Sequence, residues 1–72
     1  IWVYDNEPRS RQIADKISKS IDSGDKVVIW PSGIEHKDLN DMSNYGINVE
    51  SVVQSNVYQG LEAKLKLSNW KI

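Results

Sequence analysis

The feature that most constrains the fold lies at residues 1–8, where an apolar run ends in acidic residues and a proline. The run is β-branched and aromatic, which is typical of a strand covered on both faces in a parallel sheet, so a strand is predicted over residues 1–5. Asp5 and Glu7 end this run, and α/β proteins keep their ligand sites at the carboxyl ends of such strands. Pro8 suits the first position of a helix. The segment therefore predicts a strand, an acidic edge and the start of a helix.

A helix and a second strand are expected next. Apolar residues fall on one helical stripe between residues 8 and 23, and Gly24 suits the left-handed position after the helix. Residues 26–30 form another β-branched run, which Pro31 and Gly33 stop. A strand–helix–strand unit crosses over in the right-handed sense and joins parallel strands. Asp5, Glu7 and the segment after residue 30 are therefore expected to converge at one edge.

Two shorter helices are predicted in the middle of the chain. Asp38 and Asp41 stand as a cap and a third-position acid, and Gly46 suits the end of the first helix. Its expected buried side consists of Leu39, Met42 and Tyr45. Asn48 is expected to cap the next helix, which carries Val49, Val52 and Val53.

Residues 58–70 give conflicting signals. Leucine and alanine alternate with charged residues from 61 to 67, as in a half-exposed strand, whereas Leu, Glu, Ala and Lys are strong helix formers. A helix is favoured, because a C-terminal strand would need a neighbour that the sequence does not identify. Trp70 is expected to anchor this segment on the core.

Composition limits the class of protein. Nine basic and ten acidic residues give a net charge of -1, which argues against a general electrostatic grip on nucleic acid. There is no Cys and only one His, which leaves neither a thiolate site nor a complete zinc site. No apolar run approaches the roughly 20 residues of a membrane span, and no signal peptide is visible. We expect one partial domain over residues 1–72, excerpted from a longer cytoplasmic protein with no membrane partner.

The acidic residues suggest a metal site. Mg²⁺ prefers oxygen ligands and is usually held by one or two carboxylates together with substrate phosphates. Asp5 and Glu7 at the end of one strand, with Asp38 arriving after the next, could hold Mg²⁺ or Mn²⁺ for phosphoryl transfer. These three residues are the predicted catalytic and metal-binding residues.

Each of these residues also has a simpler interpretation. Asp5 or Asn6 could cap the helix expected at Pro8, with Glu7 favourable near its positive end. On local grounds, Asp38 is favoured as a helix cap over a ligand. These alternatives stay open from the sequence.

Basic side chains near the acidic edge have two interpretations as well. Arg9 and Arg11 suit a solvated helix face, although near a helix start they could also contact phosphate or nucleic acid. Lys37, next to Asp38, has the same two interpretations. His36 is expected to be an exposed loop residue.

Three segments together resemble a known family. They are residues 3–8 followed by a helix, residues 27–31, and the Lys-Asp-x-Asn-Asp sequence at 37–41. In this order and spacing they look like the second half of a Toprim domain, the catalytic fold of DnaG-type primases, topoisomerases and some nucleases. Phage primases are the most similar group. The resemblance implies an α/β fold with a Toprim-like (Rossmann-like) parallel strand–helix–strand core and additional C-terminal helices, present here as a partial domain.

The resemblance also implies an activity. In the family a strand ends in Asp-x-Asp, matched here by Asp5 and Glu7. Phage primase-helicases also carry a Lys-Asp-x-Asn-Asp/Glu motif, matched here by residues 37–41, in which Asp38 would support the metal. The implied function is binding of Mg²⁺ and synthesis of short RNA primers from ribonucleotides on single-stranded DNA, with a replicative helicase as partner. Glu7 departs from the usual second Asp, and the upstream Glu of the family is not in this chain. The chain alone is therefore expected to bind metal weakly and to make no primers.

Two other functions are consistent with the same residues. The parent protein could be a Toprim nuclease or topoisomerase. Alternatively, the chain could be a small non-catalytic α/β interaction module, in which the acids cap helices and the Trp residues face a partner.

Overall fold

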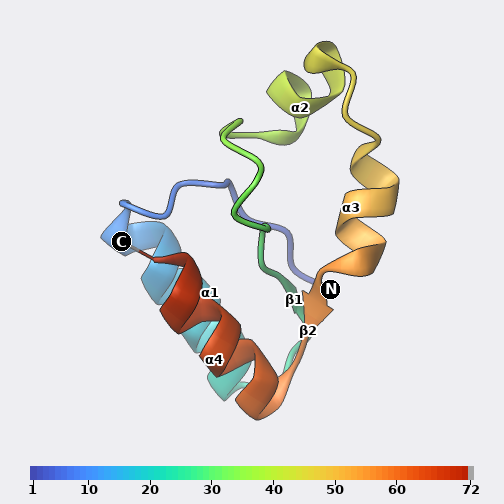
Figure 1. Ribbon diagram of the computed structural model, residues 1–72. Coiled ribbons are helices and arrows are strands. Elements are labelled where there is room, and N and C mark those ends of the chain that lie inside the picture. The colour runs from blue at the N-terminus through green and yellow to red at the C-terminus, as the bar shows by residue number, and fades with distance from the viewer. Residues whose placement is uncertain (72) are drawn as a thin grey trace.

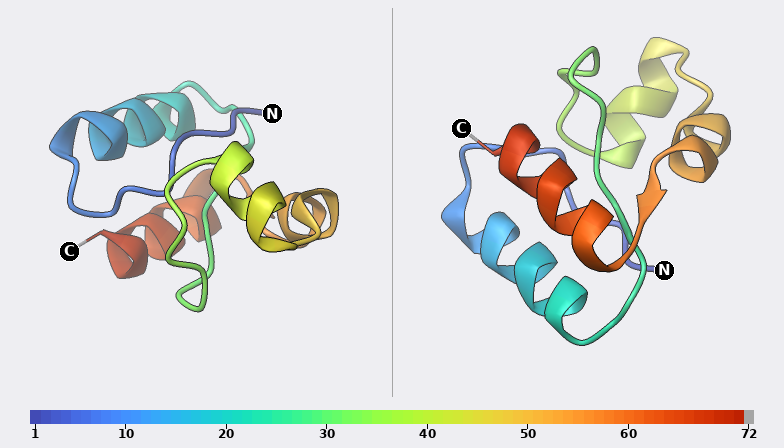
Figure 2. Two further views of the ribbon diagram at one scale, coloured as in Figure 1. Left: turned by 90° about the horizontal axis from the view of Figure 1, so that it is seen from above. Right: turned by 60° about the horizontal axis from the view of Figure 1, so that its bottom comes forward.

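Helices dominate the computed structural model, which describes residues 1–71. The elements in order are α1 (Arg11–Asp22), β1 (Val27–Val28), α2 (Leu39–Tyr45), α3 (Val49–Ser55), β2 (Val57–Tyr58) and α4 (Gly60–Trp70). Figure 1 shows α1 and α4 side by side and antiparallel on one side of the short strands, with α2 and α3 on the other side. The two views of Figure 2 show the same separation into two groups of helices. The predicted domain end at residue 72 lies outside the described residues.

The sheet corrects the predicted fold class. Its two strands are antiparallel, with Val27 opposite Tyr58 and Val28 opposite Val57. The N-terminal segment adds one isolated parallel bridge, between Trp2 and Val27. The predicted parallel strand–helix–strand core, with its Toprim-like arrangement, is therefore wrong for the described residues.

The first segment fails to become a strand because a side chain takes the place of the next backbone donor. Trp2 exchanges two backbone hydrogen bonds with the neighbouring segment, at 3.0 and 2.9 Å. Two residues later the carbonyl of Tyr4 accepts instead from Trp30 Nε1, at 2.8 Å. The Ile29 N–H donates to the carbonyl of Asn56 on the other side. That bond continues the pairing with β2, whereas the Tyr4 carbonyl is bonded to an indole instead of a backbone N–H, so the ladder with the N-terminal segment ends after one bridge.

Helix α1 begins at Arg11, three residues later than Pro8 would place it. The Ser10 side chain accepts from the N–H of Ile13, so Ser10 is the N-cap, while Pro8 lies in the preceding turn. The helix ends as predicted: Ser23 is the C-cap and Gly24 has a φ of 82°. A positive φ is strained for residues with a Cβ, which explains the glycine.

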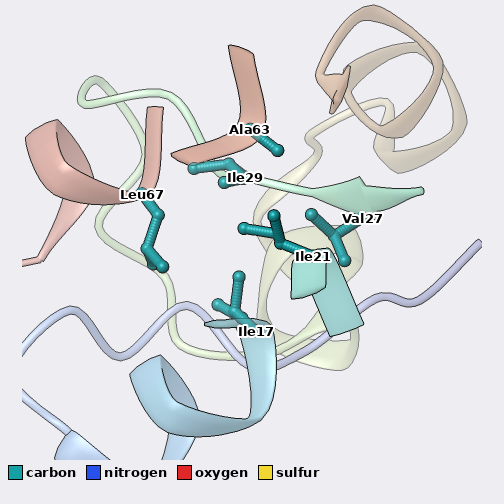
Figure 3. Close-up of a cluster of buried hydrophobic side chains, with 6 residues drawn as sticks. All are labelled: Ile17, Ile21, Val27, Ile29, Ala63 and Leu67. Carbon is teal, nitrogen blue, oxygen red and sulfur yellow. The ribbon is translucent and has the colours of Figure 1, made fainter. Parts of the chain in front are cut away.

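The larger apolar cluster joins α1, α4 and β1. Its buried members are Ile17, Ile21, Val27, Ile29, Ala63 and Leu67, whose side chains converge in Figure 3. Each fully buried large aliphatic side chain contributes roughly 1.5–3 kcal/mol relative to exposure. The helix favoured for residues 58–70 is confirmed from residue 60 onward, where α4 begins, whereas Tyr58 belongs to β2.

The smaller apolar cluster lies under α2 and α3. Val28, Trp30 and Met42 are its buried members, and Trp70 packs against both clusters, as predicted for an anchor. Leu39 and Tyr45 are exposed, so the predicted buried side of α2 is right only for Met42.

The ends of α2 and the start of α3 follow the sequence signals. Asp38 caps α2, and Gly46 ends it in the left-handed conformation. Asn48 caps α3 by accepting from the N–H of Ser51, at 3.2 Å. These three boundary predictions are confirmed.

Candidate functional site

The acidic turn lies against the segment that precedes α2. The backbone N–H of Asn6 donates to the carbonyl of Lys37 over 2.6 Å. In the same place the Lys37 ammonium lies 3.2 Å from a carboxylate oxygen of Glu7. Residues 5–7 and 37–38, which about 30 positions separate, therefore meet at one edge of the molecule.

The positive charge of Lys37 lies within the field of several carboxylates. Its hydrogen bond to Glu7 and the charge of Glu7 raise the pKa of Lys37 above 10.5, and the charges of Asp5 and Asp38 add to the rise. Partial loss of hydration acts in the opposite sense. Of the three predicted metal ligands, Glu7 contacts Lys37 directly, whereas Asp5 and Asp38 act on it only through their charge.

The carboxylates do not form a preformed set of metal ligands. Among residues 1–71, no three His, Asp or Glu side chains come together in a way that could hold a metal ion. The oxygen donors and their negative charge do suit Mg²⁺ or Mn²⁺, which needs only one or two protein carboxylates when phosphates complete the shell. Metal binding by Asp5, Glu7 and Asp38 stays a prediction.

Two of the acids differ in their local bonding. One oxygen of Asp38 accepts from the N–H of Asp41, at 2.9 Å, so the cap predicted on local grounds is present. Asp5 is exposed and caps no helix, because Ser10 caps α1. The interpretation of Asp5 or Asn6 as a helix cap is therefore wrong.

Asn6 is the residue of this region that the sequence analysis missed. It is buried, with a side chain that donates to the carbonyls of Ile34 (2.8 Å) and His36 (3.1 Å). Its oxygen accepts from the indole N–H of Trp70, at 3.0 Å and 64 positions away in sequence. An Asn between two acids has no periodicity that would reveal this role.

His36 is half-buried, which corrects the prediction of an exposed loop residue. Its ring centroid lies 4.4 Å from that of Tyr45, with the two planes tilted by 39°. Its Nδ1 atom is buried and has no hydrogen-bond partner among the described residues.

A wide groove borders the acidic turn. Its volume is about 1140 Å³, and its lining includes Glu7, Arg9, Trp30, Tyr58, Lys66 and Trp70. Lys66 lies over the Tyr58 ring, 5.2 Å from its centroid. Arg9 and Arg11 are both exposed, and neither forms an ion pair with a carboxylate of residues 1–71. Of the two, Arg9 borders the groove, whereas Arg11 lies on the first turn of α1.

In the part of the chain that the structure describes, every helix is too short or too polar to cross a membrane.

Comparison with known proteins shows that this chain is similar in sequence to a phage protein. No protein-family model matches the chain. A DNA primase of Enterobacteria phage T4 is 37% identical over 75 residues, an alignment that takes in 97% of this chain and 22% of the primase. The chain thus spans about a fifth of the length of the curated relative it matches. The segment is related to a phage DNA primase, as the motif at residues 37–41 predicted.

Proposed function

We propose that this chain is the metal-binding part of the catalytic domain of a phage-type DNA primase. Asp5, Glu7 and Asp38 would hold Mg²⁺ or Mn²⁺ at the edge where the turn at 5–7 meets residues 37–38. The observation that carries this proposal is the position of Lys37: its ammonium is 3.2 Å from Glu7 and feels the charges of Asp5 and Asp38. Glu7 contacts Lys37, and Asp5 and Asp38 act on it through their charge, so negative charge collects at this edge, where substrate phosphates could complete the shell of a divalent ion.

The bound ion would activate an attacking hydroxyl and neutralise the charge on the leaving group. The chain supplies the rest of the local chemistry. Glu7 and Asp5 provide negative oxygens, and the cap bond to Asp41 holds the Asp38 carboxylate in one orientation. Lys37 and the exposed Arg9 and Arg11 would contact phosphates of the nucleotide or template.

The activity of the whole protein is part of the proposal. It would polymerise ribonucleotides into short primers on single-stranded DNA, beside a replicative helicase. The relation to the T4 primase supports this function. A Toprim-type fold is not part of the proposal, because the two strands of the described residues pair antiparallel and the parallel core implied by the segments at residues 3–8, 27–31 and 37–41 is not formed.

A titration with Mn²⁺ tests the metal site. Paramagnetic broadening in ¹H–¹⁵N NMR spectra of the 72-residue chain should begin at residues 5–7 and 37–38. Asp5→Asn should weaken the binding by roughly tenfold, because each carboxylate adds strongly to the attraction for a divalent ion. Glu62→Gln, which removes an exposed acid in the first turn of α4, should leave it unchanged. Uniform broadening, or equal effects of the two substitutions, would contradict the proposal.

The reaction is tested with the full-length protein that contains this chain. Supplied with single-stranded template, ribonucleotides and Mg²⁺, it should produce short RNA, and Asp5→Asn should abolish that product. Cleavage of the DNA without RNA synthesis would instead favour a nuclease.

A further inference from the structure

The structure assigns a positioning role to Asn6 and Trp70: we propose that their hydrogen bond fixes the acidic turn, and so makes α4 part of the metal site without contact to the ion. This inference rests on the proposed function of Asp5 and Glu7. It concerns two residues that carry no charge and that lie 64 positions apart.

The first step of the argument is the burial of Asn6. Asn6 is only 7% exposed, and its side chain forms hydrogen bonds with Ile34, His36 and Trp70. A buried amide that loses a partner costs free energy, because water cannot replace the bond. The side chain is therefore held in one orientation. Since Asp5 and Glu7 are its direct neighbours in the chain, the same restraint fixes the backbone that carries both carboxylates.

The second step is that Asn6 also fixes the opposite half of the site. Its amide group binds the carbonyls of Ile34 and His36, and its backbone N–H binds the carbonyl of Lys37. These bonds hold the segment that leads directly into Asp38. One buried residue thus sets the distance between the two groups of predicted ligands.

The third step links this arrangement to α4. Trp70, the last residue of α4, packs against both apolar clusters, while Ala63 and Leu67 bury the rest of that helix face. Apolar packing therefore determines where the indole N–H lies, and the indole N–H binds Asn6. Around metal sites, residues that orient the ligands typically change metal affinity by about 10–100-fold when they are replaced.

The main test compares two substitutions of the same kind. Trp70→Phe removes the N–H that binds Asn6 but keeps an aromatic ring against the clusters. Trp2→Phe is the matched control, because the Trp2 N–H donates to Asp25 instead, at 3.0 Å. In Mn²⁺ titrations followed by electron paramagnetic resonance, Trp70→Phe should weaken affinity roughly tenfold, and Trp2→Phe should not change it. Circular dichroism spectra should show that both variants are folded. Equal affinities in the two variants would overturn the positioning role and leave the metal site standing.

A second variant separates positioning from charge by the sign of its effect. Asn6→Asp adds a carboxylate between Asp5 and Glu7, and charge alone would make Mn²⁺ bind more tightly. A carboxylate cannot donate to the carbonyls of Ile34 and His36, so the positioning role predicts weaker binding. Tighter binding by this variant would overturn the inference.

The positioning role can also be judged without metal. The Asn6 backbone amide should exchange its hydrogen faster in Trp70→Phe than in Trp2→Phe, because the turn would open more often. If the unaltered chain bound no Mn²⁺, the proposed function would fall, and this exchange experiment would still decide the role of Trp70. Equal exchange rates would reject it.

Discussion

Two regions of this small protein are held together in different ways. The α1–α4 pair closes on aliphatic side chains such as Ile17 and Leu67. The turn at residues 4–7 is held against residues 30–37 and against Trp70 by directed hydrogen bonds, whose side-chain donors are Trp30, Asn6 and Trp70. Packing of apolar groups is non-directional, whereas a hydrogen bond requires particular atoms at particular distances and angles. The helical region should therefore tolerate exchange between apolar side chains far better than the turn tolerates exchange of polar ones.

This difference suits what each region has to do. The helix pair needs only to bury surface, so volume and apolar character are sufficient. The proposed metal site requires that the turn expose Asp5 and part of Glu7 to solvent, as it does, while its backbone stays fixed. Directed bonds from a buried neighbour meet both requirements, because they fix the chain without covering the carboxylates.

The largest expected effect is in the helical region. Ile17→Ala removes a side chain that is 2% exposed, and such truncations cost about 2–5 kcal/mol of the free energy of unfolding. Leu65→Ala, at an α4 position that is 60% exposed, is the control and should change stability by less than about 0.5 kcal/mol. Urea unfolding followed by circular dichroism measures both. Similar losses in the two variants would mean that the buried cluster does not carry the stability of this region.

The turn should show the next largest effect. Asn6→Ala leaves the indole N–H of Trp70 and the carbonyls of Ile34 and His36 without their partner. A buried polar group without a partner costs about 1–3 kcal/mol, so the loss should be roughly 2 kcal/mol. Asn44→Ala, at an exposed position of α2, is the matched substitution and should have little effect. Equal unfolding curves in urea would show that hydrogen bonds of Asn6 do not hold the turn.

The same contrast explains which parts of the fold could be predicted from sequence. Repeating apolar positions and capping residues predicted α1 and the boundaries of α2, because both signals are local and depend on the type of residue. The periodicity of α4 gave no clear signal, because Leu61 and Leu65 are exposed while Ala63 and Leu67 are buried, so the helix was favoured on the lack of a neighbour for a strand and on the helix propensity of its residues. The convergence of residues 5–7 with 37–38 followed from an assumed parallel pairing that the structure limits to one bridge.

Single directed hydrogen bonds could not be predicted from the sequence. The bond from Trp30 to the Tyr4 carbonyl ends the expected strand, and it depends on one rotamer of one side chain. The bond from Trp70 to Asn6 joins opposite ends of the chain. Neither contact repeats along the sequence, so neither leaves a pattern. The three carboxylates could be proposed from the sequence, whereas the hydrogen bonds of the buried Asn6 to Ile34, His36 and Trp70 could not.

Substitutions of Asp38 should have a smaller effect on stability, and they separate its observed role as a cap from its proposed role as a metal ligand. Asp38→Ala removes the bond to the N–H of Asp41 and should cost about 1 kcal/mol of unfolding free energy. Asp38→Asn keeps a capping oxygen and should be nearly neutral for stability. Both variants remove the charge and should weaken Mn²⁺ binding in the NMR titration.

The control for Asp38 is another side-chain cap at a helix start, that of Ser10 on α1. Ser10→Ala removes the cap of α1 and should cost a similar free energy without a change in metal affinity. If Asp38→Asn bound Mn²⁺ as the unaltered chain does, Asp38 would be a cap alone, and the metal site would be reduced to Asp5 and Glu7.

The smallest expected effect concerns the ion pair between Lys37 and Glu7. The hydrogen bond to Glu7 and its charge raise the pKa of Lys37 above 10.5. A raised pKa in the folded state means that the pair stabilises the fold fully below the ordinary lysine pKa, and that this contribution is lost as the pH rises through the raised value. Solvent screens this exposed pair, so the change in stability should be slight and the pKa itself is the better measurement.

A ¹³C NMR titration of the Lys37 side chain should give a pKa above 10.5, and Glu7→Gln should lower it toward that value. Asp22→Asn is the matched control, since it removes the carboxylate that lies 3.7 Å from Lys64 in the other ion pair of residues 1–71. It should leave the pKa of Lys37 unchanged. An unshifted Lys37 would mean that this exposed pair does not form in solution. The buried bonds of Asn6 would then hold the turn against residues 34–37 without help from charge, and the contrast with the helical region would rest on those directed bonds alone.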